Sequence, residues 1–154
     1  MKEESQVRAL VERYPYMFKL SNTLDLYAGW LPPFVVLCDE IDALLAGRPF
    51  VFHFLQIKEK FGRFRVYFYL GLPTCEPSTA VAAQELAHCQ AAIQQCVESV
   101  HAACASRCMV CGTSATLRRD GSLMLCLCDE HAKWSGQDSP WSSAKIRMDR
   151  PSPR

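Results

Sequence analysis

The chain has 154 residues, of which 49% are hydrophobic, and a formal net charge of +1. This length fits one domain with a small appendage. The near-neutral charge excludes a global field that would attract nucleic acid or an acidic partner, so only local basic clusters could do so. No apolar run approaches the ~20 residues of a membrane span, and Met1 to Gln6 lacks the apolar segment of a secretory signal. We therefore expect a cytoplasmic protein without membrane contact, in which the nine cysteines form no disulfide framework.

Apolar residues at helical spacing predict two N-terminal helices, over residues 3–13 and 33–46. The segment between them, residues 14–31, is rich in aromatic residues and is predicted to be irregular. Gly29-Trp30 is expected to form a turn just before the second helix.

Two strands are predicted next, over residues 50–58 and 63–70, because both stretches are aromatic and β-branched. A turn at 59–62 would join them into an antiparallel hairpin. Arg63 and Arg65 would share one face of the second strand with two tyrosines, while four apolar side chains share the other face. The alternation therefore predicts a half-buried hairpin.

A long helix is predicted after a cap at Ser78 or Thr79, and it continues to about Ser106. Its apolar residues alternate in steps of four and three, which makes one continuous stripe. We expect this stripe to lie on the apolar face of the hairpin. Its members are Ala82, Leu86, Cys89, Ile93, Cys96, Val100 and Ala103.

Two close pairs of potential metal ligands follow the long helix. Cys108 and Cys111 are separated by two residues, as are Cys128 and His131, and sixteen residues lie between the pairs. Three thiolates and one imidazole complete the tetrahedron of a structural zinc site. The spacing therefore predicts one structural Zn²⁺, with no open position for water and hence no Lewis-acid hydrolysis.

Cys126 is the alternative to Cys128 as a ligand, since both would point to the same side of a strand. We favour Cys128, because it makes a regular two-residue turn with His131. Residues 116–119 and 122–127 are expected to form a small hairpin between the two ligand pairs.

These elements predict an α+β fold, with helices packed on an antiparallel β-hairpin and a C-terminal, zinc-stabilised hairpin module of the treble-clef or knuckle type. The core would span residues 1–106 and the zinc module residues 107–133. Residues 134–154 are rich in Ser, Pro, Asp, Lys and Arg, so we expect a flexible tail.

Four motifs occur in order over about residues 28–132: a Gly-Trp turn, an acidic helix, a basic hairpin and the Cys/His pairs. Their sequences are Gly29-Trp30-Leu31-Pro32, Leu37-Cys38-Asp39-Glu40-Ile41-Asp42, the run from Gln56 to Tyr67, and Cys108-x2-Cys111-Gly112 with Cys128-x2-His131.

This order resembles a family of small uncharacterised bacterial and phage proteins with a GW…LC…KEKFGxLRFY core and a terminal CxxCG…CxxH zinc module. The resemblance implies that Cys128 rather than Cys126 is the ligand. The chain departs from the family pattern at Ser122-Leu123, where members carry Gly-Trp. The resemblance implies a fold outline and no activity.

Basic residues form two clusters, one on each predicted hairpin: Lys58, Lys60, Arg63 and Arg65, and then Arg118 and Arg119. Phe61 and Tyr67 accompany the first cluster, so contact with nucleic acid or with a partner is one interpretation. The other is a solvated hairpin face whose cations protect an exposed edge, and the near-neutral charge favours it.

Two further groups of residues have side chains that could carry chemistry. Asp39, Glu40 and Asp42 could form a carboxylate or metal site, although we favour a solvated acidic surface that pairs with the basic cluster of the hairpin. His101 and Cys104 have the spacing of a thiol–base pair, but no orienting acid is apparent, so we expect no nucleophile there.

The sequence has no Gly-rich phosphate loop, nucleophile elbow or H-E-x-x-H motif. We therefore favour a non-enzymatic, zinc-stabilised binding or adaptor protein that contacts another protein, such as an inhibitor encoded by a phage or mobile element. Nucleic-acid binding through the basic hairpins at 58–65 and 118–119 is the alternative, and a small enzyme with an unrecognised site is the third hypothesis.

Overall fold

A four-stranded sheet in the order β3-β2-β1-β6 organises the chain. In the computed structural model, β2 (Val51–Lys60) and β3 (Arg63–Gly71) form an antiparallel hairpin, β1 (Thr23–Tyr27) runs parallel to β2, and β6 (Lys145–Asp149) pairs antiparallel with β1. The structure describes residues 2–19, 23–74, 77–133 and 144–149. The predicted α+β class and the hairpin are confirmed.

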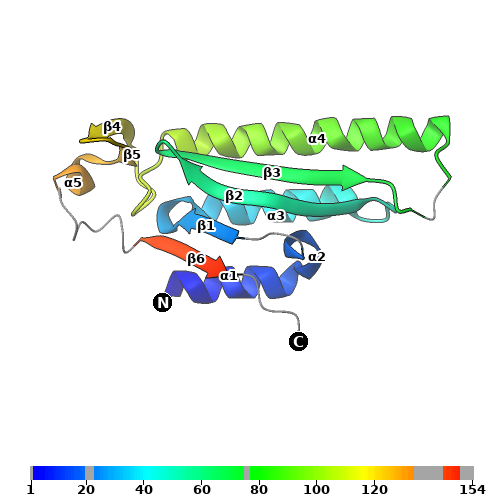
Figure 1. Cartoon of the computed structure of the whole chain (residues 1–154), viewed down its shortest axis with the longest axis horizontal. Helices are drawn as coiled ribbons and strands as arrows, with labels where there is room; N and C mark the ends of the chain where they lie inside the picture. The colour runs from blue at the N-terminus through cyan, green and yellow to red at the C-terminus, as the bar shows by residue number, and fades with distance from the viewer. Residues whose placement is uncertain (1, 20–22, 75–76, 134–143, 150–154) are drawn as a thin grey trace.

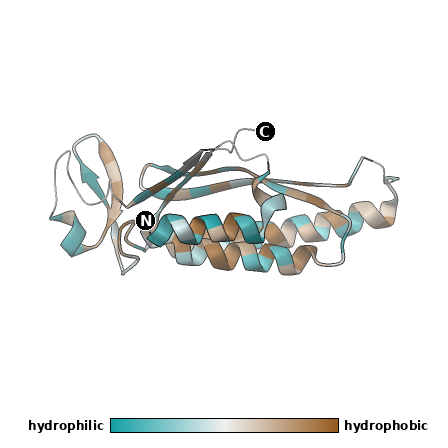
Figure 2. Cartoon of the chain, turned by 90° about the horizontal axis from the view of Figure 1, so that it is seen from below, coloured by the Kyte–Doolittle hydropathy of each residue, from teal (hydrophilic) through white to brown (hydrophobic). Residues whose placement is uncertain are grey.

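The helices α1, α3 and α4 lie on one side of this sheet (Figure 1 and Figure 2). Within the described part of the chain, no helix is long and apolar enough to cross a membrane. The helix bounds are α1 Lys2–Arg13, α2 Pro15–Phe18, the 3₁₀ helix η1 Ala28–Trp30, α3 Leu31–Leu45, α4 Ala80–Ala105 and α5 Asp129–Ala132.

Cross-strand pairing divides the β2–β3 hairpin into two faces, because residues directly opposite each other share a side. The inner face is apolar and packs under α3 and α4, where Phe34 contacts Phe54 and Phe64 at ring-centroid distances of 5.6 and 5.8 Å. We call the opposite side the outer face. Its members are Val51, His53, Leu55, Gln56, Lys58 and Lys60 from β2, and Arg63, Arg65, Tyr67 and Tyr69 from β3.

The long helix α4 begins at the predicted cap, where the Thr79 side chain accepts a hydrogen bond from the Ala82 N–H at 3.0 Å. The predicted stripe is correct for Cys89, Ile93 and Val100, which are buried. It is wrong at its last member, because Ala103 is exposed. Val97 and Cys104 are buried instead, since steps of four keep them on the face that contacts β3.

Two strands were missed by the sequence analysis. The segment 14–31 was expected to be irregular, yet it contains α2, β1 and η1. The flexible tail expected over 134–154 is wrong for residues 145–149, because they form β6, while 134–143 and 150–154 lie outside the described residues. Each strand is only five residues long and is stabilised by pairing with the other, which no local pattern reveals.

The C-terminal module (residues 107–133) contains a second hairpin, made of β4 (Thr116–Asp120) and β5 (Leu123–Leu127). The module packs on the core at two glycines. At Gly62, in the β2–β3 turn, an added Cβ would lie 2.5 Å from the Leu117 side chain and 2.8 Å from the Met124 carbonyl oxygen. The tip of the first hairpin therefore touches the second.

Gly29 makes the other contact. Its N–H donates to the Met109 carbonyl at 2.8 Å, and its own carbonyl accepts from Arg107 Nε at 3.1 Å. The buried Trp30 indole donates to the Arg107 carbonyl at 3.2 Å. A Cβ at Gly29 would lie 1.9 Å from the Cys108 carbonyl oxygen, so no other residue fits here without moving backbone. The Gly-Trp turn is therefore the part of the core on which residues 107–109 of the module pack.

We predict that Gly29→Ala lowers the free energy of unfolding by about 3 kcal/mol, the upper end of the usual cost of overpacking. Urea unfolding of the purified protein measures this change. Val36→Ala, at an exposed position of α3, is the control and should change it by less than about 0.5 kcal/mol. Equal effects of the two substitutions would contradict the close packing of Gly29 against the Cys108 carbonyl.

Candidate metal centre

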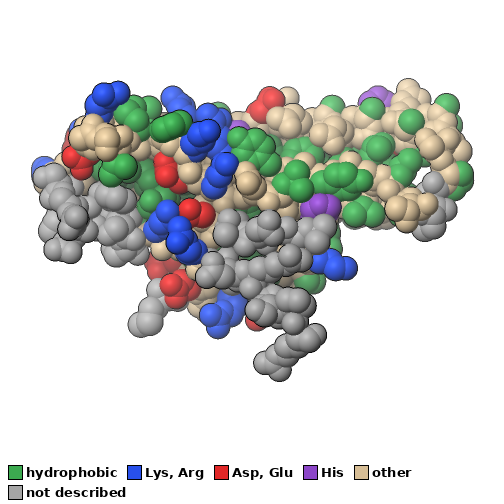
Figure 3. All heavy atoms as spheres, viewed as in Figure 1, with side chains coloured by type: hydrophobic (Ala, Val, Ile, Leu, Met, Phe, Trp, Pro, Cys, Tyr) green, Lys and Arg blue, Asp and Glu red, His purple; other side chains and the backbone are tan. Residues whose placement is uncertain are grey.

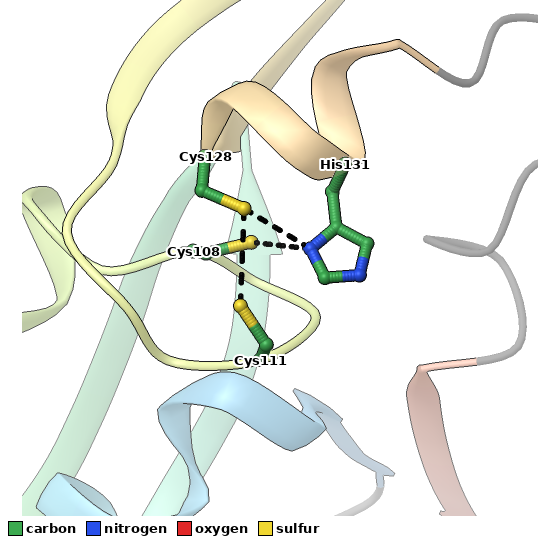
Figure 4. Close-up of side chains that lie close together, drawn as sticks. All are labelled: Cys108, Cys111, Cys128 and His131. Carbon is green, nitrogen blue, oxygen red and sulfur yellow. Dashed lines mark hydrogen bonds between the residues drawn. The ribbon is translucent and has the colours of Figure 1, made fainter.

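Four side chains from two parts of the C-terminal module converge on one point (Figure 4). Cys108 and Cys111 lie in the turn that follows α4, Cys128 is the N-cap residue of α5, and His131 lies in α5. Their ligand atoms all lie within 4.8 Å of one another. Among the described residues, this is the one group of His, Cys, Asp or Glu with the arrangement to hold a metal ion.

The distances within the cluster are short. Cys111 Sγ lies 3.8 Å from Cys128 Sγ, and His131 Nδ1 lies 3.5 Å from Cys108 Sγ and 3.1 Å from Cys128 Sγ. The imidazole therefore presents Nδ1, not Nε2, to the three sulfurs (Figure 4). With three thiols and one imidazole, the protein can fill four positions around an ion.

Local backbone geometry explains how the first pair forms. The Gly112 N–H donates to the Cys108 carbonyl at 2.9 Å, and the Cys108 N–H donates to the Thr113 carbonyl at 2.8 Å, which closes a tight turn. Gly112 has a φ of +77°, in the left-handed region that favours glycine. A turn, a hairpin and the short helix α5 thus carry the two ligand pairs in the order that the sequence predicts.

Electrostatics favour a negative charge at Cys128. Burial opposes the thiolate, but hydrogen bonds from the His131 backbone and from the His131 and Thr113 side chains outweigh it and lower the pKa of Cys128 to about 6. Burial raises the pKa of the Cys108 thiol instead. A bound cation would supply the positive charge that keeps a buried thiolate ionised.

Cys126, the alternative ligand, does not join the cluster. Its thiol donates to the Ala105 carbonyl at 3.4 Å, and burial raises its pKa. The structure thus brings together Cys108, Cys111, Cys128 and His131, as predicted. The eight cysteines in the described residues form no disulfide.

The predicted basic residues have different surroundings in the two hairpins. On the outer face, Lys58 pairs across the strands with Arg65, and Lys60 pairs with Arg63. Arg118 is instead part of the module, because it donates to the Leu127 carbonyl at 3.0 Å and forms an ion pair with Asp129.

The acidic cluster on α3 has partners of its own. Tyr14 donates to Asp39 at 2.5 Å and Tyr16 donates to Asp42 at 2.6 Å. The hydrogen bond to Asp39, together with burial, raises the pKa of Tyr14 to about 12. The expected pairing of these acids with the basic hairpin is therefore wrong, because α3 and the outer face lie on opposite sides of the sheet.

His101 and Cys104, the two residues with the spacing of a thiol–base pair, are both engaged by the core. His101 Nε2 accepts a hydrogen bond from the Val66 N–H at 3.1 Å, so this nitrogen is occupied by β3. Burial raises the pKa of Cys104 to about 12, which keeps it an uncharged core thiol at neutral pH.

Two side-chain contacts were not predicted from the sequence, one beside the Cys/His cluster and one on the outer face of the hairpin. Thr113 Oγ1 lies 3.1 Å from Cys111 Sγ, and His53 stacks on Tyr69 with ring centroids 5.0 Å apart. His53 lies within a predicted strand, but its stacking partner depends on strand register, which is fixed only in the folded sheet.

No family model, curated protein or solved structure matches this chain. The resemblance to small bacterial and phage proteins therefore stays a prediction.

We predict that Cys128→Ser abolishes stoichiometric metal binding, whereas Cys126→Ser retains it, since a serine at 126 keeps a donor for the Ala105 carbonyl. Elemental analysis after exhaustive dialysis, with circular dichroism to verify folding, measures this difference. Retention of metal by the first variant and loss by the second would reassign the ligand.

Proposed function

We propose that the protein binds single-stranded nucleic acid on the outer face of the β2–β3 hairpin, beside a structural zinc site. The observation that carries the proposal is the shared orientation of Lys58, Lys60, Arg63 and Arg65 with two exposed tyrosines. In Figure 3, Lys and Arg side chains gather where the hairpin meets the module, and hydrophobic side chains continue along the rest of the hairpin.

The hairpin and the two helices packed on it, α3 and α4, carry opposite charge, although the net charge of the chain is only +1. Glu59 is the one acid of the hairpin, and it pairs with Phe64 of the inner face and accepts a hydrogen bond from the Gly62 N–H. On the opposite side, α3 and α4 contain acids and no Lys or Arg. The outer face therefore supports a local positive potential that suits a phosphate backbone.

Aromatic side chains adjoin these cations. Tyr67 and Tyr69 are 47% and 45% exposed, and Phe61 at the hairpin tip is 69% exposed. Lys58 Nζ lies 5.5 Å from the centre of the Tyr67 ring, so a cation and a stacking surface occupy one place. Proteins that bind single strands combine positive charge with exposed aromatic rings, because every base has a face that can stack on a ring.

We also propose that zinc is the ion of the Cys/His cluster. With metal–sulfur bonds of about 2.3 Å and metal–nitrogen bonds of about 2.0 Å, a tetrahedral zinc site places two sulfurs about 3.8 Å apart and a sulfur and a nitrogen about 3.5 Å apart. The Cys111–Cys128 and Cys108–His131 distances of 3.8 and 3.5 Å fit these edges. The Cys128–His131 distance of 3.1 Å is shorter, so binding of the ion would lengthen it by about 0.4 Å.

The zinc has a structural role in this proposal. Four protein ligands leave no position for substrate, and ligation stabilises a module that has little core of its own. Because the tip at Gly62 touches β4 and β5, the folded module supports the basic end of the hairpin. Elemental analysis of the purified protein should find one zinc per chain, and a stoichiometric excess of another metal would contradict zinc.

The protein-partner hypothesis makes a different prediction about the same face. A protein partner would bind with a modest dependence on salt, whereas a strand that displaces counterions gives a linear fall of log K with log salt concentration.

We predict that the double change Lys58→Gln with Arg65→Gln weakens binding of a fluorescein-labelled oligothymidylate and reduces the salt slope by about 1.4, that is, about 0.7 for each lost phosphate contact. Fluorescence anisotropy over a series of salt concentrations measures both quantities. The matched control is Lys2→Gln with Arg8→Gln on α1, which removes the same charge from the helical side.

Equal weakening by the two double variants would show a net-charge effect and contradict a defined face. Absence of any binding at low salt would overturn the proposed function.

Tyr67→Ala should cost about 1–3 kcal/mol of binding free energy if a base stacks there, and Tyr67→Phe should cost little.

A further inference from the structure

A groove of about 300 Å³ lies between β3, an edge strand, and α4. Arg65 and Tyr67 line it from the hairpin, and Gln90, Gln94 and His101 line it from α4. It therefore opens directly beside the cations and rings of the outer face. Its volume is at the lower end of the range for small-ligand sites, about 300–1,000 Å³, which suits one planar ring rather than a folded segment.

The groove offers directional polar groups. Gln94 Nε2 donates to Glu98 at 3.2 Å, which leaves the Gln94 carbonyl oxygen as an acceptor. Within the described part of the chain, the Gln90 side-chain amide has no hydrogen-bond partner, so both its donor and its acceptor are available. Because His101 Nε2 accepts from Val66, the neutral ring carries its proton on Nδ1. Burial and the nearby Arg65 lower the pKa of His101, so the ring is neutral at pH 7.

We propose that this groove receives one base of the bound strand and that Gln90, assisted by Gln94, selects adenine. The inference rests on the proposed nucleic-acid function. A glutamine amide matches adenine in a bidentate way, since its carbonyl accepts from N6 and its NH₂ donates to N7. Arg65 holds the adjoining phosphate, and Tyr67 stacks on the neighbouring base.

An extended peptide added to the edge of β3 is the competing occupant, and the geometry disfavours it. Strand addition uses the free N–H groups of an edge strand. The Val66 N–H, in the middle of β3, is already bound to His101. A base entering from the outer face needs no backbone donor of β3.

The test uses the full-length, metal-loaded protein and labelled oligothymidylates in which every third base is thymine, adenine, cytosine or guanine. We expect the wild type to bind the adenine-containing strand about tenfold more tightly than pure oligothymidylate, which is the lower end of the discrimination of one bidentate pair. Gln90→Ala should remove this preference by lowering affinity for the adenine-containing strand about tenfold. Gln95→Ala, an adjacent glutamine of α4 outside the groove, should keep the preference.

Equal affinity of the wild type for all four strands would overturn the adenine groove while leaving the proposed function intact. Absence of binding to every strand would overturn both. Loss of the preference in Gln90→Ala and Gln95→Ala alike, or in neither, would also overturn the inference.

Discussion

The backbone hydrogen bond from Gly29 to Met109 joins the two halves of the molecule. It places the Gly-Trp turn against the loop that carries Cys108, so closely that a single added carbon would meet the Cys108 carbonyl oxygen at 1.9 Å. An ion held by the Cys/His cluster would fix the shape of that loop, and with it the place of the second hairpin. The module can pack this closely on the core only because Gly29 and Gly62 have no side chain.

A second contact extends this constraint to the surface. Because the tip of the first hairpin packs on Leu117 and Met124, the module supports the end of the hairpin where the basic residues lie. The proposed zinc would then act at a distance from the proposed binding face. It would hold the surface in place without touching a ligand, which agrees with a site whose four positions are all filled by protein.

Net charge conceals the feature on which the proposed function depends. A value of +1 argues against a polyanion partner when it is considered for the chain as a whole. The sheet, however, separates a basic outer face from helices α3 and α4, which carry only acids. Asp39 and Asp42 of α3 accept hydrogen bonds from Tyr14 and Tyr16, and not from the hairpin. Local potential, and not total charge, decides where a phosphate chain would lie.

Much of this architecture could be predicted from sequence, and the failures have common causes. The hairpin faces and the ligand pairs follow from short-range rules of alternation and spacing, and both agree with the structure. β1 and β6 could not be predicted from composition, because each is five residues long and their pairing joins residues more than a hundred positions apart. At Gly29 the sequence predicts only a turn. The need for glycine there comes from the close approach of Cys108, which is remote in sequence.

In the function proposed for this protein, the outer face of the β2–β3 hairpin binds a single strand of nucleic acid. The most direct test is a map of amide chemical-shift changes in the isotope-labelled, zinc-loaded protein as an oligonucleotide is added. We expect the largest changes at Lys58, Arg65 and Tyr67, with little change along α1 and α3. Changes confined to the helical side, or no change at saturating oligonucleotide, would contradict the account.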